Sequence, residues 1–190
     1  MKNIHETREA WLLALAAELR PLFEDAGLNL SGIRCSCSWP SKTIRKRLGE
    51  CWHSKASEDG TREIFITPRL DDGLEVAGVL VHELLHAALP DEAGHKGPFK
   101  KGMKALGLEG KATATTPGEE LTQRLHKLLK IVGRYPHARL NLALANDKKQ
   151  GTRMLRRTCN GCGCIIRTTQ KWIDAYEGAS WVCPCGGVFE

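Results

Sequence analysis

The chain has 190 residues, of which 42% are hydrophobic and 26% are charged, and this composition is typical of a folded globular protein. The length fits one medium-sized domain, or a domain of about 130 residues with a small accessory module. No apolar run approaches the roughly 20 residues that span a bilayer, and the apolar stretch at 10–17 is too short for a secretory signal. We therefore expect a cytoplasmic protein with no membrane partner.

The net charge of +6 is unevenly distributed along the chain. Residues 134–190 hold nine Lys or Arg against four Asp or Glu, whereas residues 1–133 are almost balanced. A basic C-terminal third is compatible with nucleic-acid binding, and equally with a solvated surface. Charge alone does not choose between the two.

Hydrophobic periodicity predicts four helices, at 6–26, 74–89, 98–106 and 118–132. Short β-branched or alternating runs predict strands at 28–37, 49–53, 62–67, 165–169 and 181–182. Residues 136–152 are polar and charged, which is typical of a linker. The order of elements indicates an α+β protein with a small separate C-terminal segment.

The most informative motif is an HExxH sequence in the second predicted helix. His82 and His86 are four residues apart, so on a helix their imidazoles lie on one face and can reach a single metal ion. Glu83 lies beside them, where it can take a proton from water at that ion. Zinc in a catalytic site needs a third protein ligand, and His95 is the candidate because residues 90–94 break the helix. The competing histidines are His5, His53, His126 and His137.

Five cysteines are concentrated near the C-terminus. Cys159 and Cys162 have the spacing of a zinc knuckle, and Cys183 and Cys185 form a second pair, although Cys164 is a spare that can replace one of them. A segment of about 35 residues cannot form a stable hydrophobic core without a metal, so we expect a structural zinc to be part of its folding. The three earlier cysteines are interpreted as small core residues, namely Cys35, Cys37 and Cys51.

These motifs resemble the SprT-like zinc metalloproteases, which include Spartan, and most of all their short phage-encoded members. The resemblance is carried by the strand at 63–66, the HELLH helix with the downstream His95, the segment at 107–113 and the terminal cysteine ribbon. It covers roughly residues 30 to 190 of the chain. The HExxH motif is shared by many zincins, and its combination with the ribbon narrows the resemblance to this family.

The resemblance implies a zincin-like fold in which His82, His86 and His95 bind a catalytic zinc and Glu83 is the general base and acid. Zinc would polarise the substrate carbonyl, while Glu83 would take a proton from water and give it to the leaving amine. Eight residues separate His86 from His95, fewer than in the cellular SprT proteins and more than in the metzincins. No residue is predicted to stabilise the oxyanion; Tyr135 and Arg134 have no support from spacing.

Basic and aromatic side chains surround the terminal cysteines. Phosphate contacts by the basic residues and base stacking by Trp172 and Trp181 would suit single-stranded DNA, whereas both tryptophans can equally be core residues of a small module. The family resemblance, in which such proteins act on DNA-bound substrates, favours DNA as a partner. The basic residues are Arg153, Arg156, Arg157, Arg167 and Lys171.

The sequence thus predicts an α+β protein with a zincin-like metalloprotease domain at 1–135, a linker at 136–152 and a small zinc ribbon at 153–190. The predicted cofactors are two zinc ions, one catalytic and one structural. The predicted function is a zinc metalloendopeptidase that hydrolyses proteins at or near DNA. The alternative is a zinc-ribbon protein that binds nucleic acid or acts in transcription and has little or no protease activity.

Overall fold

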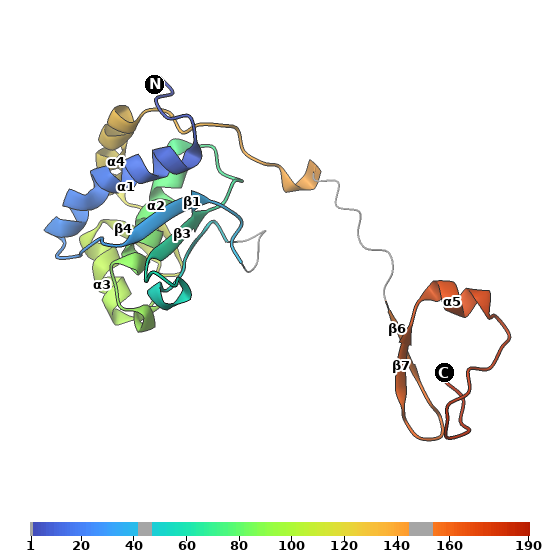
Figure 1. Ribbon diagram of the computed structural model, residues 1–190. Helices are drawn as coiled ribbons and strands as arrows, with labels where there is room; N and C mark the ends of the chain where they lie inside the picture. The colour runs from blue at the N-terminus through green and yellow to red at the C-terminus, as the bar shows by residue number, and fades with distance from the viewer. Residues whose placement is uncertain (1, 42–46, 145–153) are drawn as a thin grey trace. The chain divides into compact units, whose positions relative to one another are not determined.

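The computed structural model describes residues 2–41, 47–144 and 154–190 and divides the chain into two units, Met1–Ala143 and Leu144–Glu190 (Figure 1). Residues 145–152 of the predicted linker, and Arg153, lie outside the described residues, so the predicted domain boundaries stay a prediction. Within the described part of the chain, no helix is long and apolar enough to cross a membrane.

The first unit contains four α-helices, each within two residues of its predicted bounds at both ends. They are α1 (Arg8–Asp25), α2 (Gly73–Ala87), α3 (Gly97–Ala105) and α4 (Glu119–Val132). The central helix is α2, which begins where the Asp72 side chain accepts a hydrogen bond from the backbone N–H of Glu75. Most of its apolar side chains are fully buried against the other elements and only Leu74 and Val79 are partly buried, so the HExxH motif lies on a rigid, core-embedded helix.

A three-stranded sheet packs against α1 and α2 (Figure 1). Its order is β1–β3–β2, with β1 (Ile33–Cys37) parallel to β3 (Arg62–Ile66) and β2 (Gly49–Cys51) antiparallel to β3. Alternate residues such as Cys35 and Ile64 are buried on the helix side. Because β2 pairs only with β3, one of its edges is unpaired within this sheet, and this edge lies beside α2.

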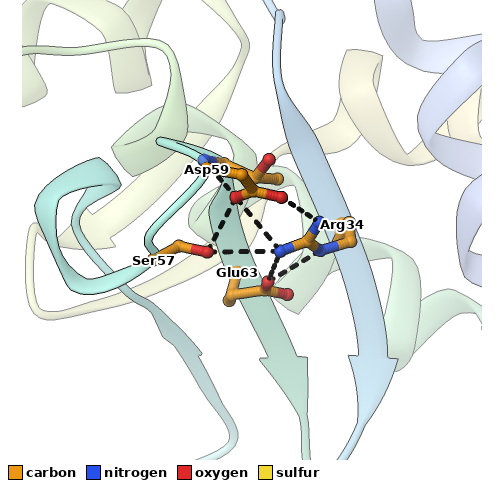
Figure 2. A network of polar contacts seen from close by, with 5 residues as sticks. Arg34, Ser57, Asp59 and Glu63 are labelled. Carbon is orange, nitrogen blue, oxygen red and sulfur yellow. Dashed lines mark hydrogen bonds and ion pairs between the residues drawn. The ribbon is translucent and has the colours of Figure 1, made fainter.

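Charged side chains tie the opposite face of the sheet to the connection between β2 and β3. Figure 2 shows the Arg34 guanidinium between Glu63 of the neighbouring strand, 2.5 Å away, and Asp59 of the connection, 2.7 Å away. Ser57 accepts a further hydrogen bond from Arg34. The Arg34 hydrogen bond holds the pKa of the Asp59 carboxyl well below its usual range. The network fixes the connection that follows η1 (Ser54–Ala56) and leads into β3.

A β-hairpin that the sequence patterns do not predict crosses α2. It consists of β4 (Leu108–Lys111) and β5 (Ala114–Pro117), and both strands are short and largely polar. The hairpin approaches α2 closely at Gly78, where a Cβ atom would lie 2.8 Å from the ring of Pro117. The glycine therefore sets how near β5 lies to the HExxH helix.

The second unit has little apolar core of its own. Its elements are β6 (Leu155–Thr158), β7 (Ile165–Thr168) and the short helix α5 (Gln170–Ala175), with η3 (Leu142–Leu144) spanning the boundary between the units. The predicted strand at 181–182 is only an isolated bridge from Val182 to Val188. Among the described residues from 154 onward, Cys159, Thr168 and Cys183 are the buried ones. Two of these three are cysteines, so hydrophobic burial alone does not explain the fold of this unit.

Candidate metal centres

Helix α2 and the turn that follows it bring three imidazoles together. His82 and His86 lie one turn apart on the same side of α2. The chain then passes through η2 (Asp91–Ala93) and reverses at Gly94, whose φ of 48° is the left-handed conformation that glycine adopts readily. This reversal places the ring of His95 against both helical histidines. The predicted trio is thus gathered at one point.

The spacing of the three rings fits a zinc ion. The Nε2 atom of His95 lies 3.1 Å from Nε2 of His86 and 3.4 Å from Nε2 of His82. Tetrahedral zinc with Zn–N bonds of about 2.0–2.1 Å places its nitrogen ligands roughly 3.3 Å apart. Three neutral imidazoles also form the donor set of catalytic zinc sites that keep one position open. The cluster is therefore consistent with an HExxH-type site.

The surroundings keep these histidines neutral at physiological pH. Burial, together with a smaller effect of the neighbouring imidazoles, lowers the pKa of His82 to about 4 and that of His86 to about 3. Burial also lowers the pKa of the more exposed His95. A metal ligand must offer an unprotonated nitrogen, so each ring is in the form that binds zinc.

His82 is oriented by a hydroxyl group from the β4–β5 hairpin. The Nδ1 atom of His82 lies 2.8 Å from Oγ1 of Thr115, at hydrogen-bond distance. If Nδ1 carries the proton and donates it to the hydroxyl, Nε2 is left with its lone pair toward His95. Phe99 of α3 packs against all three imidazoles, with ring centroids 4.4–5.0 Å apart. Thr115 therefore holds the orientation of the His82 ring, and Phe99 supports the positions of all three rings.

The side chain of Glu83, a residue of α2, lies against the edge strand β2. Its side chain is 6% exposed, and burial raises its pKa to about 8. The backbone N–H of Cys51 donates a hydrogen bond to the carboxylate and partly opposes this rise. Gly49 has no side chain at the point of closest approach, where a Cβ atom would lie 2.7 Å from Glu83 Oε1. The edge strand thus positions Glu83 through one amide and one glycine.

These groups line one wall of a groove of about 890 Å³. Residues 49–53, which contain β2, form one side of it, and residues 113–115 at the turn of the β4–β5 hairpin form another. Cys51 is half-buried in this wall rather than being a core residue, whereas Cys35 is buried as predicted. His82, Glu83, His86 and His95 all line this one groove.

The loop that carries His95 is anchored at its start. Asp91 Oδ1 lies 2.8 Å from Nη1 of Arg62, at the start of β3, and 3.3 Å from Nδ1 of His53. The Arg62 contact is an ion pair without a well-directed hydrogen bond. Since Asp91 begins η2, this pair fixes the turn between His86 and His95 to the sheet.

Four thiols gather in the second unit. Sγ of Cys159 lies 3.5 Å from Sγ of Cys185, and Sγ of Cys162 lies 3.7 Å from Sγ of Cys183. Zn–S bonds of about 2.3 Å place tetrahedral thiolates roughly 3.8 Å apart, so this cluster is consistent with a zinc-binding module. Cys164 lies outside the cluster, and its carbonyl instead accepts a hydrogen bond from the N–H of Cys159. All eight cysteines are free thiols.

Two side chains that the sequence spacing does not support as oxyanion stabilisers lie away from the groove. Tyr135 is buried against Trp11 and below the guanidinium of Arg8, and neither Tyr135 nor Arg134 lines the groove. Sequence reasoning missed Thr115, Gly49 and the Cys51 amide, because no local pattern marks a group that acts through tertiary contact. Of the competing histidines, His53 reaches the groove, but as a partner of Asp91.

Comparisons of this chain with protein-family models, with curated proteins and with solved structures find no match. The geometry of the two donor clusters therefore carries the functional argument, and the SprT-like resemblance rests on motifs alone.

In metal-free protein, stability is expected to be greatest near pH 6.5. The histidine pKa values lie below the ordinary 6.5, so unfolding takes up protons and stability falls as the pH drops from 6.5. The Glu83 pKa of about 8 lies above the ordinary 4.5, so stability also falls as the pH rises toward 8. Urea unfolding in EDTA from pH 4 to 8 measures both limbs. The range ends at pH 8 because burial raises the pKa of the Cys35 and Cys51 thiols to about 12, which lowers the stability of any variant at higher pH. Glu83→Gln should abolish the fall between pH 6.5 and 8, whereas the exposed Glu92→Gln should retain it; an unchanged fall in Glu83→Gln contradicts the assignment.

Removing the Thr115 hydroxyl is expected to weaken zinc binding. Thr115→Val keeps the shape but loses the hydrogen bond to His82, and loss of such an outer partner typically costs about 10–100-fold in metal affinity. Competition with a chromophoric chelator measures the affinity of the histidine site. Thr115→Ser should restore it, and Thr116→Val, at an exposed position of the same strand, serves as the control. Equal affinity in Thr115→Val and Thr116→Val would exclude this role.

Proposed function

We propose that the protein is a zinc-dependent metalloendopeptidase. The observation that carries this proposal is the convergence of three neutral imidazole nitrogens and a buried carboxylate on one groove. That combination supplies a metal-binding triad, with a proton acceptor next to His82 on the helix that also carries His86, as the chemistry of peptide hydrolysis requires.

His82, His86 and His95 would hold the zinc through their Nε2 atoms. When bound, zinc supplies Lewis acidity that polarises a peptide carbonyl and acidifies water. Glu83 takes the proton of the attacking water on a carboxylate oxygen and passes it to the nitrogen of the leaving amine. Its burial raises its proton affinity, which suits a group that must hold the proton between these two steps.

The edge of β2 offers a way to bind a polypeptide. The carbonyl of Leu48 and the N–H of Trp52 bond to residues next to or within β3, so in an antiparallel ladder Gly49 and Cys51 direct their backbone groups the other way, toward α2 and the groove. An extended peptide can pair with such an edge through its main chain. This mode of binding would lay a scissile bond across the groove with little dependence on sequence, which fits a protein substrate.

The family suggested by the motifs accords with this proposal. We infer a zincin-like domain of the SprT type, because the HExxH helix, His95 and the cysteine module occur together in that order. The phage-encoded members remain the nearest resemblance on the motifs. The inference rests on the motifs and on the shape of the site.

For the second unit, we propose binding of single-stranded DNA. In the antiparallel pair of β6 and β7, Arg156 lies directly opposite Arg167, and both side chains are exposed. Like charges in this position destabilise a hairpin unless an anion lies between them. A phosphate backbone supplies that anion, so the arginine pair supports a nucleic-acid partner.

Exposed aromatic rings in the same unit support base stacking. Trp172 is 48% exposed and stacks on Tyr176, with ring centroids 6.0 Å apart and an interplanar angle of 15°. The ammonium group of Lys171 lies 5.4 Å from the centroid of the Trp172 ring. A largely exposed aromatic stack with a cation beside it is a typical binding surface for single-stranded bases.

Replacement of Glu83 is expected to abolish proteolysis. Zinc-loaded wild-type protein should cleave β-casein, or its own chain, and Glu83→Gln should lower the rate by at least about 100-fold because the proton acceptor is lost. Gel electrophoresis and mass spectrometry of fragments, with and without single-stranded DNA, measure the cleavage.

Glu92→Gln is the matched control, since it makes the same chemical change on an exposed residue near the site. Cleavage that survives in Glu83→Gln would refute the mechanism. If neither protein cleaves any substrate although zinc is bound, the alternative of a zinc-stabilised nucleic-acid-binding protein without protease activity is favoured.

Loss of the paired arginines is expected to weaken DNA binding and its salt dependence. Arg156→Ala with Arg167→Ala should lower affinity for a fluorescent oligothymidine and reduce the slope of log K against log salt by roughly 0.7 for each lost phosphate contact. Trp172→Ala should weaken binding with little change in that slope. Fluorescence anisotropy at several salt concentrations measures both effects.

Arg157→Ala is the control, because Arg157 alternates to the other face of β6. Equal losses in this variant and in the paired-arginine variant would indicate unspecific charge attraction rather than the proposed surface.

A further inference from the structure

Arg47 is a cation that lines the groove and has no part in the zinc binding or the proton transfer proposed above. It lies just before β2, lines the groove together with Glu83 and the three histidines, and has a side chain that is 44% exposed. The other arginine in the wall, Arg62, is only 17% exposed and is paired with Asp91. Arg47 is thus the more accessible of the two guanidinium groups in this groove.

A carboxylate on the edge strand holds Arg47 in place. Nη1 of Arg47 lies 2.6 Å from Oε1 of Glu50, which also accepts a hydrogen bond of 2.7 Å from the hydroxyl of Ser41. The second oxygen of Glu50 accepts hydrogen bonds from the N–H of Ser41 at 2.8 Å and from Nε1 of Trp52 at 3.2 Å. Four donors thus fix this carboxylate, and the carboxylate in turn fixes the cation.

The electrostatics of Glu50 agree with this arrangement. Burial alone would raise its pKa, but hydrogen bonds from Ser41 and the charge of Arg47 hold the pKa below its usual value. Glu50 is therefore ionised at neutral pH and remains a partner for the guanidinium. Because a guanidinium carries five N–H donors, the bond to Glu50 leaves others for a ligand in the groove.

Arg47 shares the groove with the groups that would surround a reacting bond. Because Glu83 and the three histidines line the same groove, a substrate bound there would lie beside both these groups and the Arg47 guanidinium. The carboxylate of Glu50 holds that guanidinium in one position. In a partly desolvated groove, such a preorganised cation favours negative charge on bound substrate.

We propose that Arg47, positioned by Glu50, binds an anionic oxygen of the peptide substrate. Two sources share this chemistry: the oxyanion that develops on the reacting carbonyl, and a carboxylate side chain beside the scissile bond. The inference rests on the proposed peptidase function. It assigns the groove an electrophilic group that the HExxH motif itself does not contain.

The test compares Arg47→Met with Arg47→Lys and with Arg124→Met, which removes the same charge from an exposed position on α4. Two fluorogenic peptides copied from a bond cleaved in β-casein differ only in Glu or Gln beside that bond. A phosphinic peptide of generic sequence, which carries a tetrahedral anionic group and is not hydrolysed, measures binding without turnover. Thermal unfolding of each variant verifies the fold.

If the oxyanion is the ligand, Arg47→Met lowers kcat about 100–1,000-fold on both peptides, leaves KM nearly unchanged and weakens the phosphinic peptide. If a substrate carboxylate is the ligand, KM rises about 10-fold or more for the Glu peptide alone. Arg47→Lys should restore part of either effect, since it retains the charge but not the fork of donors.

The proposal is overturned if Arg47→Met and Arg124→Met have the same kcat and KM on both peptides and the same affinity for the phosphinic peptide. If both variants still hydrolyse the peptides, the proposed peptidase function is unaffected. Failure of wild-type protein to hydrolyse any peptide counts against the peptidase function instead. In that case equal binding of the phosphinic probe to wild type and Arg47→Met, or no binding to either, overturns the role of Arg47 as well.

Discussion

The histidine site of the first unit is organised around three imidazole nitrogens at hydrogen-bond distance, where two lone pairs that face each other would repel. His95 approaches His86 to 3.1 Å and His82 to 3.4 Å, and burial prevents these rings from relieving the contact by taking up protons. Only a shared cation or proton makes such an arrangement favourable. The surrounding elements each hold one part of it: the buried helix α2, the hairpin that carries Thr115, and the ion pair that anchors the turn at Asp91.

The sequence was sufficient to predict the parts of this site that are encoded locally. Short sequence spacings are enough to place His82 and His86 on one helix face and to form the two cysteine pairs. The four helices follow from hydrophobic periodicity. The β4–β5 hairpin was missed because its strands are four residues long, polar and without alternation. Thr115 was missed because it contacts His82, which lies 33 residues earlier in the chain. Arg47 was missed because it joins the other groove residues only in the folded protein.

The two units reach stability by different physical means. The first buries large apolar side chains such as Trp11, Phe23 and Phe99 completely, so its fold rests mainly on packing. The second buries two cysteines and a threonine among its described residues, and it places two arginines opposite each other on one hairpin. Metal binding would offset the small apolar core, and an anionic partner would offset the repulsion between the two arginines. What weakens this unit in isolation is therefore what its ligands would correct.

The two donor clusters also differ in chemical hardness. Four thiolates are soft ligands that favour cadmium or copper(I) as well as zinc, whereas three imidazoles are borderline ligands that accept cobalt or nickel readily. The two clusters of this chain would therefore prefer metal ions of different polarisability. Exposure to a mixture would give a heterobimetallic protein, with a soft ion in the cysteine module and a spectroscopically visible borderline ion beside Glu83. The two donor clusters are thereby distinguished by the class of metal ion that each would favour.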